Sequence, residues 1–286
     1  MLAQVRGTTI YFDVEGAGLV PDGPTMRERP AAMVIHGGPG GDHTGFKPAM
    51  SPLADVMQLI YFDHRGQGRS GRGDSARYTL DENVEDMEAL RRHLGLGQVV
   101  SIGTSYGGMV AMAHAARHPK AVSKLVLIVT AAHSGFVPRA EQFIRSHGTA
   151  EQQRACERLW SGTFGTADQM AEYYAAMGPL YSRRYVPAAA EAARGRATYS
   201  PEPLNRAFGP GGVLRSFDLR AEIAGIAVPT LVLAGRHDWI CPPEFSEEIH
   251  RLIPGSRLQI FEDSSHSIRA DEPDALNAAI RDFITG

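Results

Sequence analysis

Residues 99–107 read Val-Val-Ser-Ile-Gly-Thr-Ser-Tyr-Gly, an apolar run that passes directly into a G-x-S-x-G pentapeptide. The run predicts a buried strand over Val99–Ile102, and the small residues that follow predict a helix over Gly108–Arg117. A serine on such a tight turn needs glycine neighbours, because larger side chains would clash with the strand and the helix. The pattern therefore predicts a strained turn that presents Ser105 as a nucleophile.

Short apolar runs alternate with helix-like segments along most of the chain, which is typical of a parallel sheet covered by helices on both faces. The chain begins differently, since Leu2–Val5 and Ile10–Val14 predict an antiparallel hairpin, followed by a loop over Gly16–Pro30. We expect a mostly parallel, twisted sheet of the α/β class. Its further strands are predicted at Ala31–Ile35, Gln58–Phe62, Leu125–Val129, Thr230–Ala234 and Arg257–Phe261, and its helices at Leu80–Leu94, Glu244–Leu252 and Pro273–Ile284.

The alternation of strands and helices disappears between residues 135 and 217. This segment contains alanine-rich helical pieces and several proline breaks, and it carries too many apolar residues to remain disordered. We therefore predict one α/β core, formed by residues 1–134 and 218–286, with an inserted helical cap (lid) formed by residues 135–217.

A serine hydroxyl is a poor nucleophile by itself, so a base and a residue that orients the base must accompany Ser105. Asp238 follows the strand predicted at 230–234, and His266 lies in the loop after the last predicted strand. The chain order Ser, Asp, His and the positions at strand ends predict a catalytic triad of these three residues. The weaker alternatives are Asp263 for the acid and His237 for the base.

The glycine-rich loop His36–Gly40 follows the strand predicted at 31–35. Acyl transfer needs N–H donors aimed at the position where the oxyanion develops, and glycine lets the backbone approach a substrate closely. We predict that the Gly38 and Tyr106 amides form the oxyanion hole. A simple tight turn is the alternative, whereas the loop lacks the patterns of phosphate-binding loops.

Composition and charge favour a small partner. The chain has 286 residues, 43% of them hydrophobic, and a formal net charge of −3, so it can bury a large core and offers no basic surface for nucleic acid. Its longest apolar stretch, Leu125–Val129, is too short to span a bilayer, and no leader pattern is evident. We expect a cytoplasmic protein that acts on a small molecule or short peptide; the sequence leaves its oligomeric state open.

No metal or cofactor is expected. Cys156 and Cys241 lack metal-binding spacing and are interpreted as free thiols. His114 and His118 stand four residues apart, but no third ligand is evident, so we interpret them as surface or capping residues. The segment Asp63–Gly66 is expected to brace the end of the sheet through hydrogen bonds and ion pairs.

These motifs together resemble the proline iminopeptidase branch of the α/β hydrolases. The resemblance covers both halves of the predicted core. It implies the α/β-hydrolase fold and a metal-free hydrolase, in which acidic residues of the lid receive the free amino group of an N-terminal proline. The matching segments are His36-Gly37-Gly38-Pro39-Gly40, Asp63-His64-Arg65-Gly66-Gln67-Gly68-Arg69-Ser70, Gly103-Thr104-Ser105-Tyr106-Gly107-Gly108, Gly235-Arg236-His237-Asp238 and Ser265-His266-Ser267.

The chain departs from that branch at two places. The branch usually has a tryptophan after the nucleophile, where this chain has Tyr106. It also tends to have a Trp-x-x-Trp-Glu run in the lid, where this chain has Trp160 without a second tryptophan or a following glutamate. Aminopeptidase, esterase, amidase and lactonase activities therefore remain open. The possible receptors for an amine are Glu157, Glu172, Glu191 and Glu202.

The sequence thus predicts a serine hydrolase that forms an acyl-enzyme on Ser105. Its substrate is a small ester, amide or lactone, or a peptide with an N-terminal proline. Two alternatives would use the same triad: a ligand-binding receptor with little turnover, and a cofactor-free lyase or perhydrolase.

Overall fold

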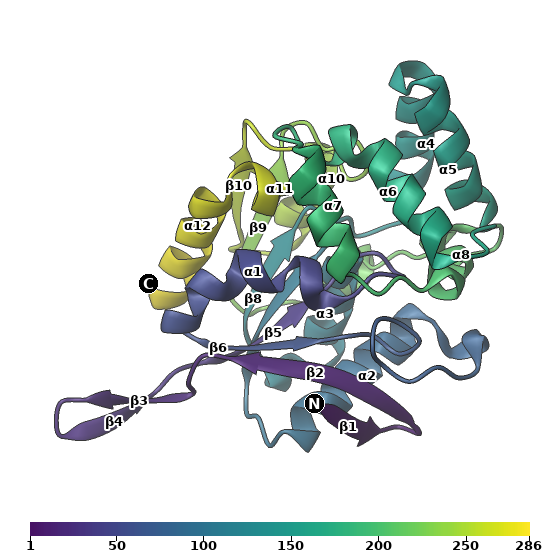
Figure 1. Cartoon of the computed structure of the whole chain (residues 1–286). Coiled ribbons are helices and arrows are strands. Elements are labelled where there is room, and N and C mark those ends of the chain that lie inside the picture. Colours follow the sequence, from purple (N-terminus) through teal and green to yellow (C-terminus); the bar gives the residue numbers. More distant parts are fainter.

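The computed structural model describes residues 1–286 and contains an eight-stranded sheet in the order β1-β2-β6-β5-β7-β8-β9-β10 (Figure 1). The first two strands pair antiparallel, and every pairing from β6 to β10 is parallel, which confirms the predicted class. The strands are β1 (Leu2–Val5), β2 (Thr8–Glu15), β5 (Ala31–Ile35), β6 (Gln58–Phe62), β7 (Val99–Thr104), β8 (Val122–Ile128), β9 (Thr230–Gly235) and β10 (Arg257–Phe261).

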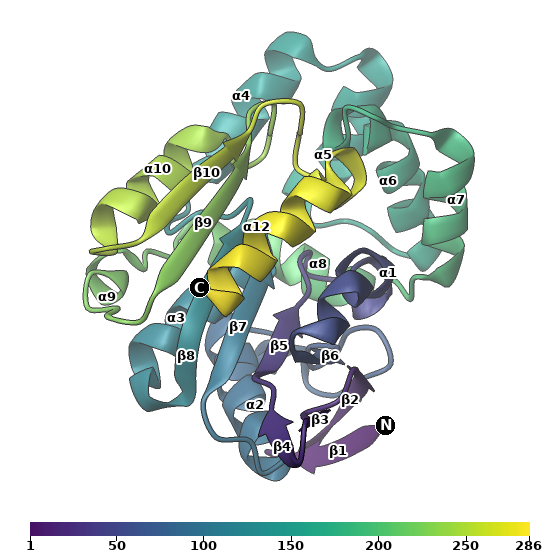
Figure 2. The same ribbon diagram turned by 90° about the vertical axis from the view of Figure 1, so that its left-hand side faces the viewer.

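Helices cover both faces of this sheet (Figure 2). One face is covered by α2, α3, α9 and α10, and the other by α1, α11 and α12. The predicted helices are confirmed with boundary shifts of one or two residues. The bounds are α1 (Lys47–Met50), α2 (Leu80–His93), α3 (Tyr106–Arg117), α9 (Arg220–Ile223), α10 (Pro243–Leu252), α11 (Ile268–Asp271) and α12 (Pro273–Thr285).

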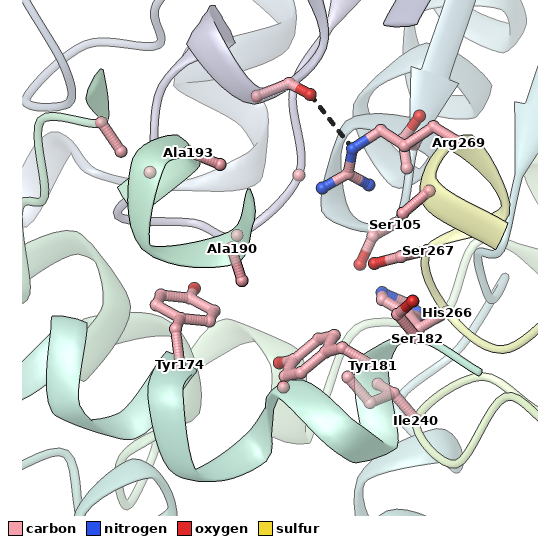
Figure 3. A pocket seen from close by; sticks show the side chains of 18 of the residues that line it. Ser105, Tyr174, Tyr181, Ser182, Ala190, Ala193, Ile240, His266, Ser267 and Arg269 are labelled. Carbon is pink, nitrogen blue, oxygen red and sulfur yellow. Dashed lines mark hydrogen bonds between the residues drawn. The ribbon is translucent and has the colours of Figure 1, made fainter. Parts of the chain in front are cut away.

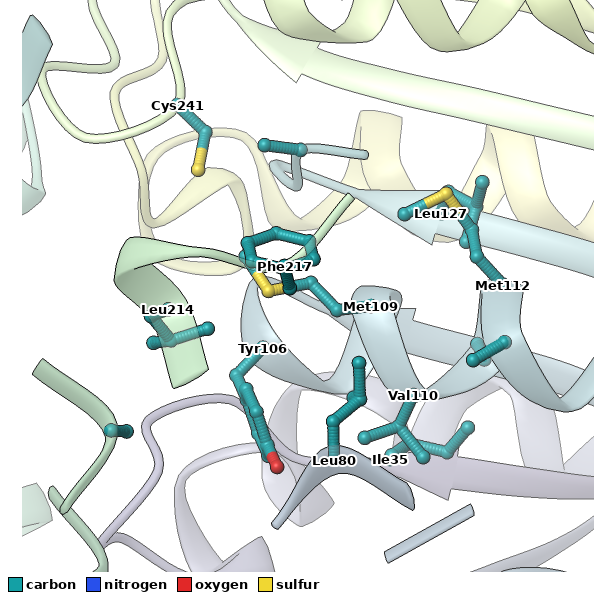
Figure 4. Packing of buried hydrophobic residues seen from close by; sticks show 14 of the residues in the cluster. Ile35, Leu80, Tyr106, Met109, Val110, Met112, Leu127, Leu214, Phe217 and Cys241 are labelled. Atoms are coloured by element: carbon teal, nitrogen blue, oxygen red, sulfur yellow. The ribbon is translucent and has the colours of Figure 1, made fainter. Parts of the chain in front are cut away.

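Two hydrophobic clusters lie on the two faces, and the alternation of side chains along each strand divides the residues between them. In β8, Leu125 and Leu127 enter the larger cluster of 49 buried residues, whereas Val126 and Ile128 enter the smaller cluster of 20. Figure 4 shows part of the larger cluster, where side chains of α3 pack against the sheet beside Leu127. Burial on both faces explains why these strands read as continuous apolar runs in the sequence.

The segment predicted as a loop over Gly16–Pro30 differs in the structure. It forms a second hairpin of β3 (Leu19–Asp22) and β4 (Thr25–Glu28), a separate two-stranded sheet. Its residues are almost all exposed, so no buried face imposes the apolar alternation by which a strand is recognised in a sequence.

Five helices lie between residues 135 and 217, where the sequence predicted an inserted cap, and Figure 1 shows them grouped at one end of the sheet. The division into a core and a cap remains a prediction. None of the helices in the structure has the length and apolar character needed to cross a membrane. The five are α4 (Phe136–His147), α5 (Ala150–Ser161), α6 (Ala167–Tyr181), α7 (Pro187–Arg196) and α8 (Pro201–Phe208).

Candidate active site

Ser105 occupies the turn between β7 and the first residue of α3. Its backbone has φ 55° and ψ −122°, a conformation that costs free energy for any residue with a side chain. Two hydrogen bonds hold it there: its N–H donates to Ile128 O at 2.8 Å, and Thr130 Oγ1 donates to its carbonyl at 2.7 Å. The strained geometry expected of a nucleophile turn is therefore present and anchored to β8 and its following loop.

The glycines of the pentapeptide are needed for close packing. A Cβ on Gly103 would lie 2.3 Å from the carbonyl oxygen of Gly107, and a Cβ on Gly107 would lie 2.2 Å from the carbonyl oxygen of Ile35. Both obstacles are backbone atoms, which cannot rotate away as a flexible side chain could. The helix can therefore start this close to the sheet only with glycine at both positions.

Asp238 and His266 form a buried pair at the ends of β9 and β10. His266 Nδ1 lies 2.7 Å from Asp238 Oδ2, and the backbone N–H groups of Ile240 and Cys241 donate to Asp238 Oδ1 at 2.8 and 3.0 Å. The bonds to both carboxylate oxygens fix the aspartate. The aspartate in turn selects the tautomer of His266 with a proton on Nδ1, which leaves Nε2 free to accept a proton.

The two weaker alternatives for the acid and the base are not part of this pair. His237 and Asp263 are both exposed. The backbone N–H of Asp263 donates to Glu272 on the outer side of the loop. The structure thus brings Asp238 and His266 together and leaves their sequence neighbours in solvent.

The loop predicted to supply the oxyanion hole lies against the nucleophile. A Cβ on Gly37 would come within 3.1 Å of Ser105 Cβ, so the loop backbone borders the serine directly. The Gly38 amide makes no hydrogen bond to another backbone group or side chain, and Tyr106, as the first residue of α3, has no helical acceptor for its N–H. Both amides border the same cavity as Ser105.

His36 holds this loop in place as a neutral imidazole. Its Nδ1 donates to Gly37 O at 2.8 Å, and its Nε2 accepts from the backbone N–H of His64 at 3.2 Å. Burial lowers the pKa of His36, and it lowers the pKa of His64 well below the ordinary range. Both rings therefore remain uncharged at neutral pH and act as packing and positioning groups.

The segment after β6 braces the sheet end as predicted. Asp63 Oδ1 accepts from the backbone N–H and from Nδ1 of His43, and its Oδ2 accepts from the Arg69 backbone N–H at 2.9 Å. Arg65 donates two hydrogen bonds of 2.6 Å to Asp86 on α2. His43 was not identified from the sequence, because nothing in its local pattern indicates a partner twenty residues away.

A cavity of about 570 Å³ lies between the sheet and the inserted helices. Ser105 and His266 both line it (Figure 3), together with Gly38 and Tyr106, whose amides are proposed for the oxyanion hole. Asp238 is bonded to His266 but does not line the cavity. Most of the wall is apolar or aromatic. Its aromatic members are Phe46, Tyr106, Phe136, Trp160, Tyr173, Tyr174, Tyr181, Tyr185, Tyr199, Phe208 and Trp239.

Positively charged residues outnumber negatively charged ones on the cavity wall. The only acidic residue that lines it is Asp42, whose carboxylate accepts hydrogen bonds from the Thr44 and Thr198 backbone N–H groups. Four arginines line the cavity, and none of the glutamates considered as amine receptors does; all four glutamates are exposed. The arginines are Arg184, Arg194, Arg196 and Arg269.

Two other sequence expectations concern histidines and cysteines. His118 is the C-cap residue of α3, and its backbone N–H donates to His114 O, as expected of a capping residue. The expectation of a surface position is wrong for His114, which is fully buried. His114 faces Glu88 of α2 across the interface of the two helices. Cys156 and Cys241 are free and buried, as expected, and no group of three or more potential metal ligands occurs.

Comparisons with known proteins support the fold and the family. The sequence model described as the alpha/beta hydrolase fold matches residues 30–273. The proline iminopeptidase PfmaB of Pestalotiopsis fici is 29% identical over 280 residues, covering 96% of this chain and 98% of that protein. The proline iminopeptidase of Saccharolobus solfataricus is 28% identical, covering 88% and 84%.

Solved structures are similar over the whole chain. An enol-lactonase from Burkholderia xenovorans has a TM-score of 0.74 and 25% identity, with complete coverage of both chains. An esterase from Exiguobacterium antarcticum, at 23% identity and a TM-score of 0.78, covers 100% of this chain and 99% of its own and shares the fold. The chain therefore belongs to the α/β-hydrolase fold family, on its proline iminopeptidase-like branch, and is a hydrolase.

Proposed function

We propose that the chain is a serine hydrolase that cleaves a small ester, lactone or amide through an acyl-enzyme on Ser105. The observation that carries this proposal is that Ser105, on its strained turn, and His266, paired with buried Asp238, line one cavity. A nucleophile, a base and a residue that orients the base are the parts that such chemistry needs.

The first half of the reaction forms the acyl-enzyme. Ser105 Oγ attacks the substrate carbonyl carbon while His266 Nε2 takes the hydroxyl proton, and Asp238 stabilises the imidazolium that results. The Gly38 and Tyr106 amides donate to the carbonyl oxygen as it becomes an oxyanion. The tetrahedral intermediate then expels an alcohol or amine, which receives the proton from His266.

The second half repeats these roles with water. His266 takes a proton from water, the resulting hydroxide attacks the acyl carbon, and the Ser105 oxygen leaves as it regains its proton. The acid product is released, and the enzyme returns to its starting protonation state. No metal or cofactor is needed for either half.

Removal of an N-terminal proline is a second candidate, because the curated relatives carry the name proline iminopeptidase. A free amine needs an uncommitted carboxylate in the cavity. Asp42 is committed to its own loop and to Thr198, and the other lining charges are arginines. The cavity therefore supports an ester, lactone or neutral amide better than an N-terminal ammonium group.

A substrate panel tests the proposal. We expect turnover of short p-nitrophenyl esters or of a simple lactone, little cleavage of prolyl and alanyl p-nitroanilides, and a loss of about 10³-fold or more in kcat for Ser105→Ala. Ser101→Ala is a matched control, since Ser101 is a fully buried serine on β7, the strand that leads to Ser105, and its hydroxyl has no hydrogen-bond partner. It should retain turnover.

Other results of the substrate panel would favour one of the alternative functions or overturn the mechanism. Strong preference for the prolyl anilide would favour the aminopeptidase. Labelling of Ser105 without turnover on any substrate would favour a receptor, and products formed without net hydrolysis would favour a lyase or perhydrolase. Ester turnover that survives in Ser105→Ala would overturn the mechanism.

A further inference from the structure

Arg269 extends into the cavity from α11, three residues after His266. Its Nε donates to Gly45 O at 3.2 Å, the contact marked in Figure 3, and its guanidinium carbon lies 4.5 Å from the centre of the Phe46 ring. One hydrogen bond and one aromatic face therefore fix the plane of the guanidinium group. The side chain is held in a defined orientation on the cavity wall.

The two terminal nitrogens of Arg269 have no protein partner. No carboxylate lies within 4.0 Å of the group, and neither Nη1 nor Nη2 donates a hydrogen bond to the protein, although both are donors. Asp271, on the same short helix, accepts from the Arg184 and Ser265 backbone N–H groups instead. Four N–H bonds of a permanently charged group thus face the cavity unused.

An unpaired cation in a largely apolar wall is costly unless a ligand compensates for it. Burial lowers the pKa of Arg269, and the charge of Asp271, which makes no ion pair with it, opposes this shift only in part. A guanidinium whose Nη1 and Nη2 are both free matches the two oxygens of a carboxylate, with which it makes parallel, charge-assisted hydrogen bonds. Tyr174, across the cavity, has a hydroxyl with no protein hydrogen bond and can add a further donor.

We propose that Arg269 is the receptor for a carboxylate group carried by the substrate, so that the enzyme prefers esters, lactones or amides of this type to their neutral analogues. This inference rests on the proposed serine hydrolase function. It is the reverse of amine recognition, because the cation is supplied by the protein and the anion by the substrate. The excess of arginines over acidic residues on the cavity wall also favours a negatively charged substrate.

Matched ester pairs test the inference. The 4-methylumbelliferyl hemiesters of succinic, glutaric and adipic acid are compared with neutral acyl esters of the same chain lengths. We expect kcat/KM at low salt to be at least 10-fold higher for one hemiester than for its neutral partner. Arg269→Met should reduce that ratio at least 10-fold, and Arg269→Lys should retain part of it, because it keeps the charge and loses the paired donors.

Arg69→Met is the matched control. The Arg69 guanidinium carbon lies 5.1 Å from the centre of the Tyr11 ring, outside the cavity, so its loss should leave the ratio unchanged. Thermal unfolding of each variant checks that it is folded. Equal kcat/KM for all charged and neutral pairs, or a ratio that Arg269→Met does not alter, would overturn the inference.

Equilibrium binding separates failure of the inference from failure of the proposed function. Calorimetry of Ser105→Ala with glutarate measures carboxylate recognition without turnover, and Ser105→Ala/Arg269→Met is its control. If glutarate binding depends on Arg269 but the wild type has no esterase activity, Arg269 is a carboxylate-binding residue and the proposed serine hydrolase reaction is rejected. If the wild type has esterase activity but shows no preference for hemiesters and does not bind glutarate, only the proposed role of Arg269 is rejected.

Discussion

The groups around Ser105 supply the features that a serine hydroxyl by itself lacks for attack on a carbonyl carbon. The strained backbone presents the hydroxyl to the cavity, and two amides are available for an oxyanion, Gly38 in the bordering glycine loop and Tyr106 at the start of α3. The proposed base, His266, is prepared in the same way, because three donors hold Asp238 and Asp238 fixes one tautomer of the histidine. In the proposed mechanism this arrangement is therefore built before substrate arrives, which is the condition for electrostatic catalysis.

A single buried histidine should make stability depend on pH. Burial lowers the pKa of His114 to about 4, against about 6.5 in an unfolded chain. The unfolded state therefore binds more protons between these values, and folding is weakened as the pH falls through this window. Between pH 7 and pH 5 this one residue should cost about 2 kcal/mol in the free energy of unfolding.

Urea unfolding at the two pH values measures this effect. His114→Gln keeps a donor for Glu88 but cannot be charged, so its stability should fall by about 2 kcal/mol less than that of the wild type on going to pH 5. His118→Gln is the control, because His118 is partly exposed on the same helix. Equal pH dependence in wild type and His114→Gln would contradict the assignment.

At the scale of elements, the contact between β5 and the start of α3 determines the site. Gly107 lets the helix approach the Ile35 and His36 carbonyl oxygens, and a Cβ there would come within 2.2 and 2.7 Å of them. The same strand ends in the loop that carries Gly38. The proposed nucleophile and oxyanion donors are therefore positioned by one helix–strand contact.

Gly107→Ala should accordingly lower the free energy of unfolding by about 1–3 kcal/mol or more, because backbone must move to admit the methyl group. Gly97→Ala is the control: nothing lies within 4 Å of a Cβ at that position, so the change should stay within about 0.5 kcal/mol. Chemical denaturation of the two variants provides the comparison. Equal stabilities would show that the helix can shift without cost.

Elements with a buried apolar pattern could be predicted closely from the sequence. The buried strands Ala31–Ile35 and Gln58–Phe62 are confirmed at both ends. The edge strand Arg257–Phe261 is confirmed as well, because its half-buried Leu258 and Ile260 alternate with exposed residues. The exposed β3–β4 hairpin was missed because its residues need no pattern that distinguishes them from a loop. His114 was placed wrongly because a helix of small residues, packed between the sheet and α2, buries nearly every side chain it carries.

At the scale of the whole molecule, the cavity joins segments that are far apart in the sequence. Its wall combines loops of the sheet with helices from the inserted segment. The balance of charges on the wall could therefore not be predicted from the sequence, because it depends on which distant residues the fold brings together. The strained turn at Ser105 and the pairing of Asp238 with His266 were predictable because each residue follows a strand end in a fixed chain order. Arg269 was not, because its role depends on Phe46 and on the lack of a carboxylate partner.

The most direct test of the account is to trap the acyl group. The enzyme is mixed with p-nitrophenyl acetate, quenched in acid within the first turnovers, and analysed by intact-protein mass spectrometry and peptide mapping. We predict one acetyl group per chain, attached to Ser105 and absent from Ser105→Ala. An acetyl group on another residue, or turnover by the wild type that is matched by Ser105→Ala, would contradict the account.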